Sequence, residues 1–335
     1  MRVWYDACTG KQVRYAIAIA KKFRALGHEV IFTTREHPDT IPLAKGLGED
    51  PLVVGKYAPT TLTSRLEESA ERIIQFARMF RDKKPDVAIA HQSVELCRVA
   101  FGLGIPIITT ADTPYAYAVN RLTLPFAHTV VVSEALPKSF TADNGAHNVA
   151  VFRGVDEVAW INEVAWIKGF KSKKTADTKR PLIVVRQIET RAVYAEKKQD
   201  NVQTLAQRLA ELGNVHVVQR YNNENEEAYK GKLGFEDTAE LVAHADLVVS
   251  YGGTITREAA LQGVPSIGIS DMAKTYVNTY LAQKGFPLFA TTEDQVIEVA
   301  KQYLGKRFDV ADKLAALENP VDVIADIAKN ITMQK

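Results

Sequence analysis

The sequence predicts an α/β protein of two domains, each built on a doubly wound parallel sheet with helices on both faces. Two series of short apolar runs alternate with helical stretches along the chain, which is the pattern of parallel strands joined by helices. The chain of 335 residues is long enough for two domains of roughly 150 residues, each with its own core. We therefore take the two series as two domains.

The first series covers the N-terminal half of the chain. A strand is expected at residues 3–5 and a helix at 11–26, where apolar side chains recur every three or four positions until Gly27 ends the pattern. Further strands are expected at residues 29–33, 52–54, 86–90, 105–109, 129–132 and 149–152. These elements predict a Rossmann-like first domain over residues 1–155.

The second series predicts a Rossmann-like domain over residues 181–307. Its strands are expected at residues 182–186, 215–219, 247–250 and 266–269, with a short one near Leu288. A connector over residues 156–180 precedes it and contains EVAWI twice, which is too short an echo for a repeat architecture. Its basic run, residues 168–180, is interpreted as a solvated linker, with a contact for an anionic acceptor as the alternative. Residues 308–335 are expected to be helical.

Composition excludes several classes of protein. Hydrophobic residues make up 46% and charged residues 24%, as in ordinary globular proteins, and the net charge of +2 gives no general case for binding nucleic acid. Cys8 and Cys97 are too few for a disulfide framework and have no metal-binding spacing. The sequence offers no apolar run of about 20 residues and no signal-like start. We expect a cytoplasmic protein without a membrane span, and leave peripheral membrane contact open.

The segment ADLVVSYGGTITREAALQGVPSIGI carries the clearest chemical signal. An apolar strand leads into Gly252 and Gly253, and a helix opens at Thr254. Glycines at such a turn let a ligand approach the backbone, and the unpaired N–H groups of the first helical turn favour negative charge. The pattern predicts a phosphate or diphosphate site. A tight turn that only closes a βαβ unit is the equally weighted alternative.

Residues that follow the glycines favour the ligand-binding interpretation. Thr254 and Thr256 place hydroxyl groups in the first helical turn, and Arg257 and Glu258 come next. A capping box would need Glu or Gln at position 257, so Glu258 has no capping role of that kind. A carboxylate beside a phosphate site is suited to accept hydrogen bonds from a ribose diol. Stabilisation of the helix dipole is its alternative role.

The run Gly234-Phe235-Glu236-Asp237 followed by AELVAHADLVVSYGGTITREAALQGVPSIGI resembles the nucleotide-sugar-binding half of GT-B glycosyltransferases of the MurG type. The resemblance implies that Phe235 holds the base, that Gly252 and Gly253 meet the diphosphate, and that Glu258 binds the ribose. VWYDA, ADTPYAYAVNRLTLPFAHTVVVSEA and VVRQIETRAVY resemble an uncharacterised, mostly archaeal, GT-B-like family. The resemblance to GT-B proteins implies two facing Rossmann-like domains with a cleft between them, a C-terminal helix that packs back on the first domain, and no bound metal.

Ligands of open parallel sheets bind outside the carboxyl ends of the strands, which identifies further candidate residues. In the second domain the rule selects Arg186 and Tyr221, besides the glycine turn. In the first domain it selects polar residues after three strands, which we assign to the acceptor side: Gly10, Lys11, Gln12, Ser93, Thr113 and Tyr115, together with Asp6, His91 and Asp112.

Glycosyl transfer needs a base for the acceptor and stabilisation of the diphosphate leaving group. Asp112 is the preferred base, with His91 and Asp6 as alternatives, although Asp112 before Thr113-Pro114 also suits an Asx-type turn. The glycine turn with Arg186 or Arg257 suits the leaving group. Lys274 lies where MurG-type enzymes carry glutamines that read the donor sugar, so the resemblance leaves that sugar unspecified.

The residues and the resemblance together predict a glycosyltransferase that uses a nucleotide sugar as donor; the resemblance implies a UDP-sugar and independence of metal. The acceptor is a glycan, a lipid-linked molecule or a small molecule, and no cofactor is expected beyond the donor substrate. An enzyme that resembles UDP-N-acetylglucosamine 2-epimerase is the first alternative, although its glutamate-rich motif is not apparent. A non-catalytic scaffold on the same fold is the second, and an enzyme acting on RNA, favoured only by residues 168–180, is the third.

Overall fold

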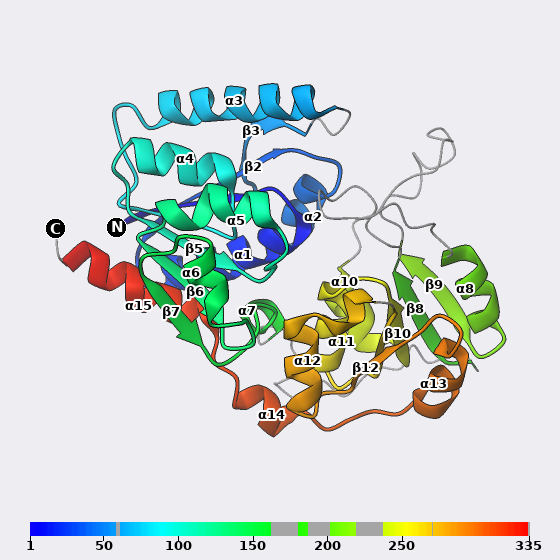
Figure 1. Cartoon of the computed structure of the whole chain (residues 1–335). Coiled ribbons are helices and arrows are strands. Elements are labelled where there is room, and N and C mark those ends of the chain that lie inside the picture. Colours follow the sequence, from blue (N-terminus) through cyan, green and yellow to red (C-terminus); the bar gives the residue numbers. More distant parts are fainter. Residues whose placement is uncertain (58–60, 162–179, 187–201, 219–236, 270, 334–335) are drawn as a thin grey trace. The chain divides into compact units, whose positions relative to one another are not determined.

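The structure is a computed structural model that describes residues 1–57, 61–161, 180–186, 202–218, 237–269 and 271–333. The chain divides into two compact units, Met1–Ala159 with Glu318–Lys335, and Trp160–Leu317. The described residues of each unit form one parallel sheet with helices around it, as the sequence predicts (Figure 1). Residues 162–179, which make up most of the expected connector, lie outside the described part of the chain.

In the described part of the first unit, seven strands pair in the order β3-β2-β1-β4-β5-β6-β7. All their pairings are parallel, and the order reverses between β1 and β4. Such a reversal is the topological switch point at which α/β proteins bind ligands. The strands are β1 Arg2–Ala7, β2 Glu29–Glu36, β3 Leu52–Lys56, β4 Val87–Ala90, β5 Ile107–Ala111, β6 Thr129–Ser133 and β7 Val149–Phe152.

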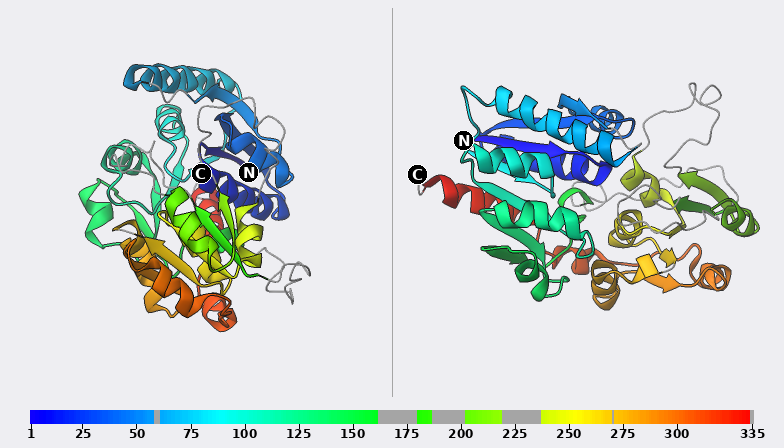
Figure 2. Two further views of the ribbon diagram at one scale, coloured as in Figure 1. Left: turned by 90° about the vertical axis from the view of Figure 1, so that its right-hand side faces the viewer. Right: turned by 45° about the horizontal axis from the view of Figure 1, so that its top comes forward.

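The reversal also places the helices on opposite faces of this sheet, because parallel crossovers are right-handed. One group includes α1 in contact with α2 and α15, and the other includes α4 in contact with α3 and α5 (Figure 2). The bounds are α1 Gly10–Ala25, α2 Thr40–Gly46, α3 Leu62–Met79, α4 Val94–Gly102, α5 Tyr117–Thr123, α6 Ser139–Asp143, α7 Val158–Ile161 and α15 Pro320–Met333, with a 3₁₀ turn at Leu124–Phe126.

Local sequence explains where the first helix begins and ends. The Thr9 side chain accepts a hydrogen bond from the Gln12 N–H and so caps α1. Gly27 follows the helix with a φ of 78°, a conformation that glycine adopts without strain. Strand β5 begins two residues later than predicted, at Ile107, because Ile105 still bonds to the end of α4 and Pro106 has no N–H for the sheet.

In the described part of the second unit, five parallel strands pair in the order β12-β11-β10-β8-β9. They are β8 Leu182–Arg186, β9 Asn214–Val218, β10 Leu247–Ser250, β11 Ser266–Ile269 and β12 Leu288–Thr291. Alternate side chains of β8 and β10 enter two core clusters, as expected for strands covered on both faces. The helices are α8 Val202–Ala210, α10 Thr238–His244, α11 Thr254–Leu261, α12 Tyr276–Gln283, α13 Val296–Tyr303 and α14 Ala311–Ala315, with a 3₁₀ helix at Asp271–Lys274.

The tail that was expected to be helical from residue 308 contains two helices. α14 ends at Ala315, and α15 starts at Pro320 after the Asn319 side chain accepts the Val321 N–H. Proline is favoured at a helix start and disfavoured inside one, so Asn319-Pro320 begins a new helix. α15 belongs to the first unit, where it contacts α1, and Lys22 lies 2.7 Å from Asp322. Among the described residues, none of the helices combines the length and the apolarity that crossing a bilayer requires.

Candidate active site

Four charged or titratable side chains meet at the carboxyl edge of the first sheet. Lys11, in the first turn of α1, places its Nζ 2.5 Å from Asp112 Oδ2 and 2.7 Å from Asp156 Oδ2. His91, directly after β4, has its Nε2 3.4 Å from Asp112 Oδ1. Asp112 follows β5, so this group, which we call the Lys11 cluster (Lys11, His91, Asp112, Asp156), lies at the switch point of the sheet.

The Lys11 cluster is largely buried, which strengthens the interactions among its charges. Lys11 neutralises one of the two carboxylates, so with a neutral imidazole the four side chains carry one net negative charge. His91 Nδ1 lies 2.7 Å from the Thr110 hydroxyl and 3.9 Å from Asp156 Oδ2.

Tyr15 adds a hydroxyl group to the cluster. Its Oη donates to Asp156 Oδ1 at 3.4 Å, and its ring packs edge-on to the His91 imidazole. Burial, and then the charge of Asp156, raises the pKa of Tyr15 well above its ordinary value, so the phenol stays protonated and remains a donor. The sequence predicted Lys11, His91 and Asp112 at this edge but not Asp156 or Tyr15. The same strand-end rule could have identified Asp156, because this residue lies in the segment that follows β7.

Hydrogen bonds between loops hold His91 and Asp112 in place. The Gln12 amide donates to the His91 carbonyl at 2.7 Å. The Gln92 amide donates to Asn120 Oδ1 at 2.6 Å, and Asn120 in turn donates to the Thr113 and Pro114 carbonyls. Among the described residues, Gln92 is the one non-glycine residue with a positive φ, 55°. Strain of this kind persists where surrounding contacts enforce it, as they do here between the β4 and β5 loops.

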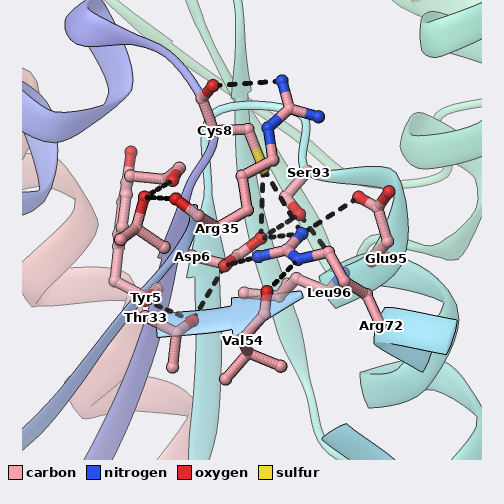
Figure 3. A network of polar contacts seen from close by, with 12 residues as sticks. Tyr5, Asp6, Cys8, Thr33, Arg35, Val54, Arg72, Ser93, Glu95 and Leu96 are labelled. Carbon is pink, nitrogen blue, oxygen red and sulfur yellow. Dashed lines mark hydrogen bonds and ion pairs between the residues drawn. The ribbon is translucent and has the colours of Figure 1, made fainter. Parts of the chain in front are cut away.

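The Asp6 side chain is fully buried and lies in a network of polar contacts with Arg72, Thr33 and Ser93 (Figure 3). Arg72 Nη2 lies 2.7 Å from Asp6 Oδ1, and the Thr33 hydroxyl donates to the same oxygen. The Ser93 hydroxyl donates to Asp6 Oδ2 at 2.6 Å, and Arg72 also donates to the Val54 carbonyl. These donors surround the carboxylate, so Asp6 is built into the interior. The strand-end rule selected Asp6 as a residue after a strand expected at residues 3–5, whereas β1 continues to Ala7 and Asp6 lies within it.

The other acceptor-side candidates have structural partners of their own. Ser93 caps α4, since its Oγ accepts the Leu96 N–H, and Thr113 donates its hydroxyl to Asp112 Oδ1 at 2.8 Å. Gly10 opens α1, and the half-buried Tyr115 lies in the loop between β5 and α5. Of the acceptor-side candidates, Lys11 is therefore a member of the Lys11 cluster. Gln12 contacts the cluster through the His91 carbonyl, and Thr113 contacts it through the Asp112 side chain.

In the second unit, the glycine turn joins β10 to α11 as predicted. Gly253 is the N-cap of α11 with a φ of −87°, so its backbone would accommodate any residue. A Cβ there would lie 2.9 Å from Arg257 Nη2, so a side chain at this position would have to displace the Arg257 guanidinium group. Arg257 donates its Nε–H to the Gly253 carbonyl, and the Thr256 hydroxyl donates to the same carbonyl at 2.8 Å. The Thr256 hydroxyl therefore faces the backbone, not the front of the turn as we expected.

Glu258 is 1% exposed, and described residues donate to both oxygens of its carboxylate. The Trp160 indole N–H donates to Oε1 at 2.9 Å, and the Thr238 hydroxyl donates to Oε2 at 3.3 Å. Trp160 is the first residue of the second unit and belongs to the first copy of EVAWI. No local pattern predicts this contact, because the two residues are 98 positions apart.

The remaining donor-side candidates lie near the loop edge of the second sheet or outside the described residues. Arg186 ends β8 in register with Ser250, the last residue of β10, which places it next to the glycine turn. Lys274 lines an open hollow of about 350 Å³ between the 3₁₀ helix, α12 and β12. Phe235 and Tyr221 lie outside the described residues.

Two groups of described residues have the atoms of a metal site: His91, Asp112 and Asp156, and separately Asp6, Cys8 and Glu95. In each group a basic side chain of the protein contacts the carboxylates. Lys11 bridges the two aspartates of the first group, and Arg72 lies within ion-pair distance of Asp6 and Glu95 in the second. The chain itself thus supplies a positive charge to the oxygen atoms that a metal ion would use.

Residues 1–333 match the family model described as "Protein of unknown function (DUF354)". The chain belongs to this family. Uncharacterized protein MJ0665 of Methanocaldococcus jannaschii is 29% identical over 335 residues, which cover 96% of both chains. The expected membership in an uncharacterised GT-B-like family is confirmed by these matches together with the solved structures that share the fold.

Three of those structures illustrate the shared fold. UDP-GlcNAc 2-epimerase of Methanocaldococcus jannaschii, in complex with UDP-GlcNAc and UDP, has a TM-score of 0.69 at 12% identity, covering 98% of this chain and 100% of that one. Spinosyn forosaminyltransferase SpnP has a TM-score of 0.63 at 15% identity, covering 99% of both. The Streptomyces sp. SF2575 glycosyltransferase SsfS6, complexed with thymidine diphosphate, has a TM-score of 0.59 at 19% identity, and the match covers 98% of this chain and 99% of that one. The predicted GT-B-like fold is confirmed.

Proposed function

We propose that this protein is a nucleotide-sugar enzyme, and specifically a glycosyltransferase that transfers a sugar from a UDP-sugar to a hydroxyl group of its acceptor. The Lys11 cluster carries the proposal. It gathers a carboxylate, an imidazole and an ammonium group at the switch point of the first sheet, where the fold favours a ligand. The glycine turn, Arg186 and Glu258 of the second unit form the proposed donor site.

In the proposed reaction, Asp112 accepts the proton of the acceptor hydroxyl as its oxygen attacks the anomeric carbon of the donor. The bond between that carbon and the diphosphate breaks, and the electron pair leaves with UDP. Lys11 and the Thr113 hydroxyl orient the Asp112 carboxylate through contacts at 2.5 Å and 2.8 Å. His91 Nε2, 3.4 Å from Asp112 Oδ1, is positioned to take the proton onward.

The leaving diphosphate is assigned to the N–H groups that open α11 and to the Arg186 side chain. Backbone N–H groups at a helix start and a guanidinium group both stabilise developing negative charge. Glu258 is assigned to the ribose hydroxyls, which would replace the Trp160 indole as donors to its carboxylate. Solved relatives of the fold in complex with UDP or thymidine diphosphate support a nucleotide as the ligand.

The experiment is a titration with nucleotide sugars, followed by measurement of UDP release with candidate acceptors. Asp112→Asn keeps the shape of the side chain, and we expect turnover to fall by about 100- to 10,000-fold while donor affinity stays unchanged. Gln302→Ala, on an exposed part of α13, is a control for handling and stability. The proposal fails if no nucleotide sugar binds, or if Asp112→Asn and His91→Gln both keep wild-type turnover.

An epimerase acting on a UDP-sugar is the second candidate, and the second carboxylate of the Lys11 cluster favours it. Epimerisation needs a base to remove a proton from a sugar carbon and an acid to return one, and Asp112 and Asp156 share Lys11. Incubation in deuterated water without an acceptor separates the two candidates. Deuterium in the sugar of the recovered donor identifies an epimerase, whereas UDP release that depends on an acceptor identifies a transferase.

A further inference from the structure

An open hollow of about 580 Å³ lies beside the carboxyl ends of β2 and β3 in the first unit. It is lined by Glu36 and Lys56, the last residues of these two strands, and by His37 and Tyr57, which follow them. Ligand sites commonly have volumes of about 300–1,000 Å³ and lie outside the carboxyl ends of parallel strands. Both the size and the position of the hollow therefore suit a ligand.

One part of the lining is aromatic and apolar. The His37 and Tyr57 rings lie 4.7 Å apart, centre to centre, with 47° between their planes. Helix α2 contributes Ile41 and Pro42. The Arg35 guanidinium group lies over the Tyr57 ring, 4.5 Å from its centre, and so helps to hold this ring in place. A ligand meets a surface that the chain has already arranged.

The other part of the lining is charged. Glu36 and Lys56 are exposed partners in the pairing of β2 with β3, and Lys56 Nζ also lies 3.2 Å from Glu68 Oε1 on α3. Charged groups beside an aromatic surface suit a pyranose ring, because its C–H face packs on aromatic rings and its hydroxyl groups both donate and accept hydrogen bonds. A hydrocarbon chain would take these charges out of water and offer them no hydrogen bonds.

Hydrogen bonds along the loop edge connect the hollow to the Lys11 cluster. Arg35 donates to the Cys8 carbonyl at 3.2 Å, and the Cys8 N–H donates to Gln12 Oε1. Gln12 in turn donates to the His91 carbonyl. In the sheet order β3 lies two strands from β1 and four from β5, a span of about 10–20 Å at the usual strand spacing. A ligand that fills the hollow and reaches Asp112 is therefore longer than one sugar residue.

We propose that the hollow binds a sugar residue of an oligosaccharide acceptor whose reacting hydroxyl lies at Asp112. The sugar packs its C–H face against Tyr57 and His37, and its hydroxyl groups meet Glu36 and Lys56. The inference rests on the proposed function, and it specifies the acceptor as a glycan of more than one residue.

Titrations followed by saturation-transfer NMR test the hollow without any donor. The probes are maltotriose, cellotriose and chitotriose, with geranyl monophosphate as the apolar alternative. We expect at least one trisaccharide to bind, and Tyr57→Ala to raise its Kd at least about 10-fold. Tyr57→Phe keeps the ring and the affinity. Tyr276→Ala, at a tyrosine of α12 that is 51% exposed, is the matched control and leaves trisaccharide binding unchanged.

Glu36→Ala is a second variant of the hollow, at an exposed side chain whose loss does not disturb the core. It is expected to raise the Kd of the same trisaccharide at least about threefold, because a hydrogen bond to a charged group is lost. Thermal melting shows whether each variant is folded, and Glu36→Ala decides the outcome if Tyr57→Ala is not.

Three results overturn the proposal: no trisaccharide binds, binding survives the folded variants of the hollow, or only geranyl monophosphate binds in a manner that depends on Tyr57. The donor titration separates this failure from failure of the proposed function. If a trisaccharide binds in the hollow but no nucleotide sugar binds the chain, the proposed function fails and the sugar-binding hollow stands. If a nucleotide sugar binds and is turned over but no trisaccharide binds, the hollow alone loses its assignment.

Discussion

The buried ion pair between Arg72 and Asp6 allows the organisation of the first unit to be tested by a single substitution. Arg72→Met keeps most of the side-chain length but removes the guanidinium group. The Asp6 carboxylate then loses the partner at 2.7 Å from Oδ1 and the donor at 3.2 Å from Oδ2, while both residues are almost completely buried. The Val54 carbonyl also loses its hydrogen bond from Arg72.

The expected cost follows from this burial. Removing one partner of a buried ion pair leaves an uncompensated charge and typically costs about 3–5 kcal/mol. A domain is usually stable by roughly 5–15 kcal/mol, so the loss is a large share of the total. By contrast, Arg153 and Glu318 form an exposed pair at 2.7 Å in the same unit. Arg153→Met is expected to cost about 0–1 kcal/mol, which makes it a matched control.

Guanidinium denaturation followed by the fluorescence of Trp4 measures this cost in the first unit. Trp4 donates its indole N–H to Thr33, which also donates to Asp6. The chain has three tryptophans, so replacing Trp160 and Trp166 by Phe leaves Trp4 as the reporter. If Arg72→Met costs no more than Arg153→Met, the reasoning is wrong. Adding Asp6→Asn to Arg72→Met removes the unpaired charge and is expected to recover part of the loss.

Three further predictions concern thiol reactivity and the proposed donor site. Burial, and then the charge of Asp6, raises the pKa of Cys8 to about 12, so the thiol stays protonated at pH 8. Both Cys8 and Cys97 are buried, and we expect them to react with a disulfide reagent only after unfolding. Rapid reaction of the folded chain would contradict this expectation. Gly253→Val is expected to abolish UDP binding in calorimetry without unfolding the chain, because a branched side chain blocks the approach of the diphosphate to the backbone and displaces the Arg257 guanidinium group; normal binding places the phosphate site elsewhere. Glu258→Ala is expected to weaken UDP binding by about 1.5–3 kcal/mol, because a carboxylate that accepts from the ribose contributes to affinity; unchanged affinity in calorimetry removes Glu258 from the donor site.

Much of the candidate site was predictable because parallel strands end at one edge of a sheet. The rule identified His91 after β4 and Asp112 after β5, and it placed Lys11 at the start of the helix after β1. It also selected Asp6, which the structure places among Arg72, Ser93 and Thr33 instead. A strand-end rule gives a position along the chain and does not say what packs over it.

The fold class and every described strand were predictable, because they follow from patterns within a few residues: apolar runs, helical periodicity, and breaks such as Gly27 and Pro106. The partners of the buried charges were not, because they come from elements that are far apart in the sequence. Asp156 lies 145 residues from Lys11, and Arg72 lies 66 residues from Asp6. Contacts at such separations depend on how helices pack over the sheet. A charge whose partner comes from another element therefore has its role fixed by folding, and not by its neighbours in sequence.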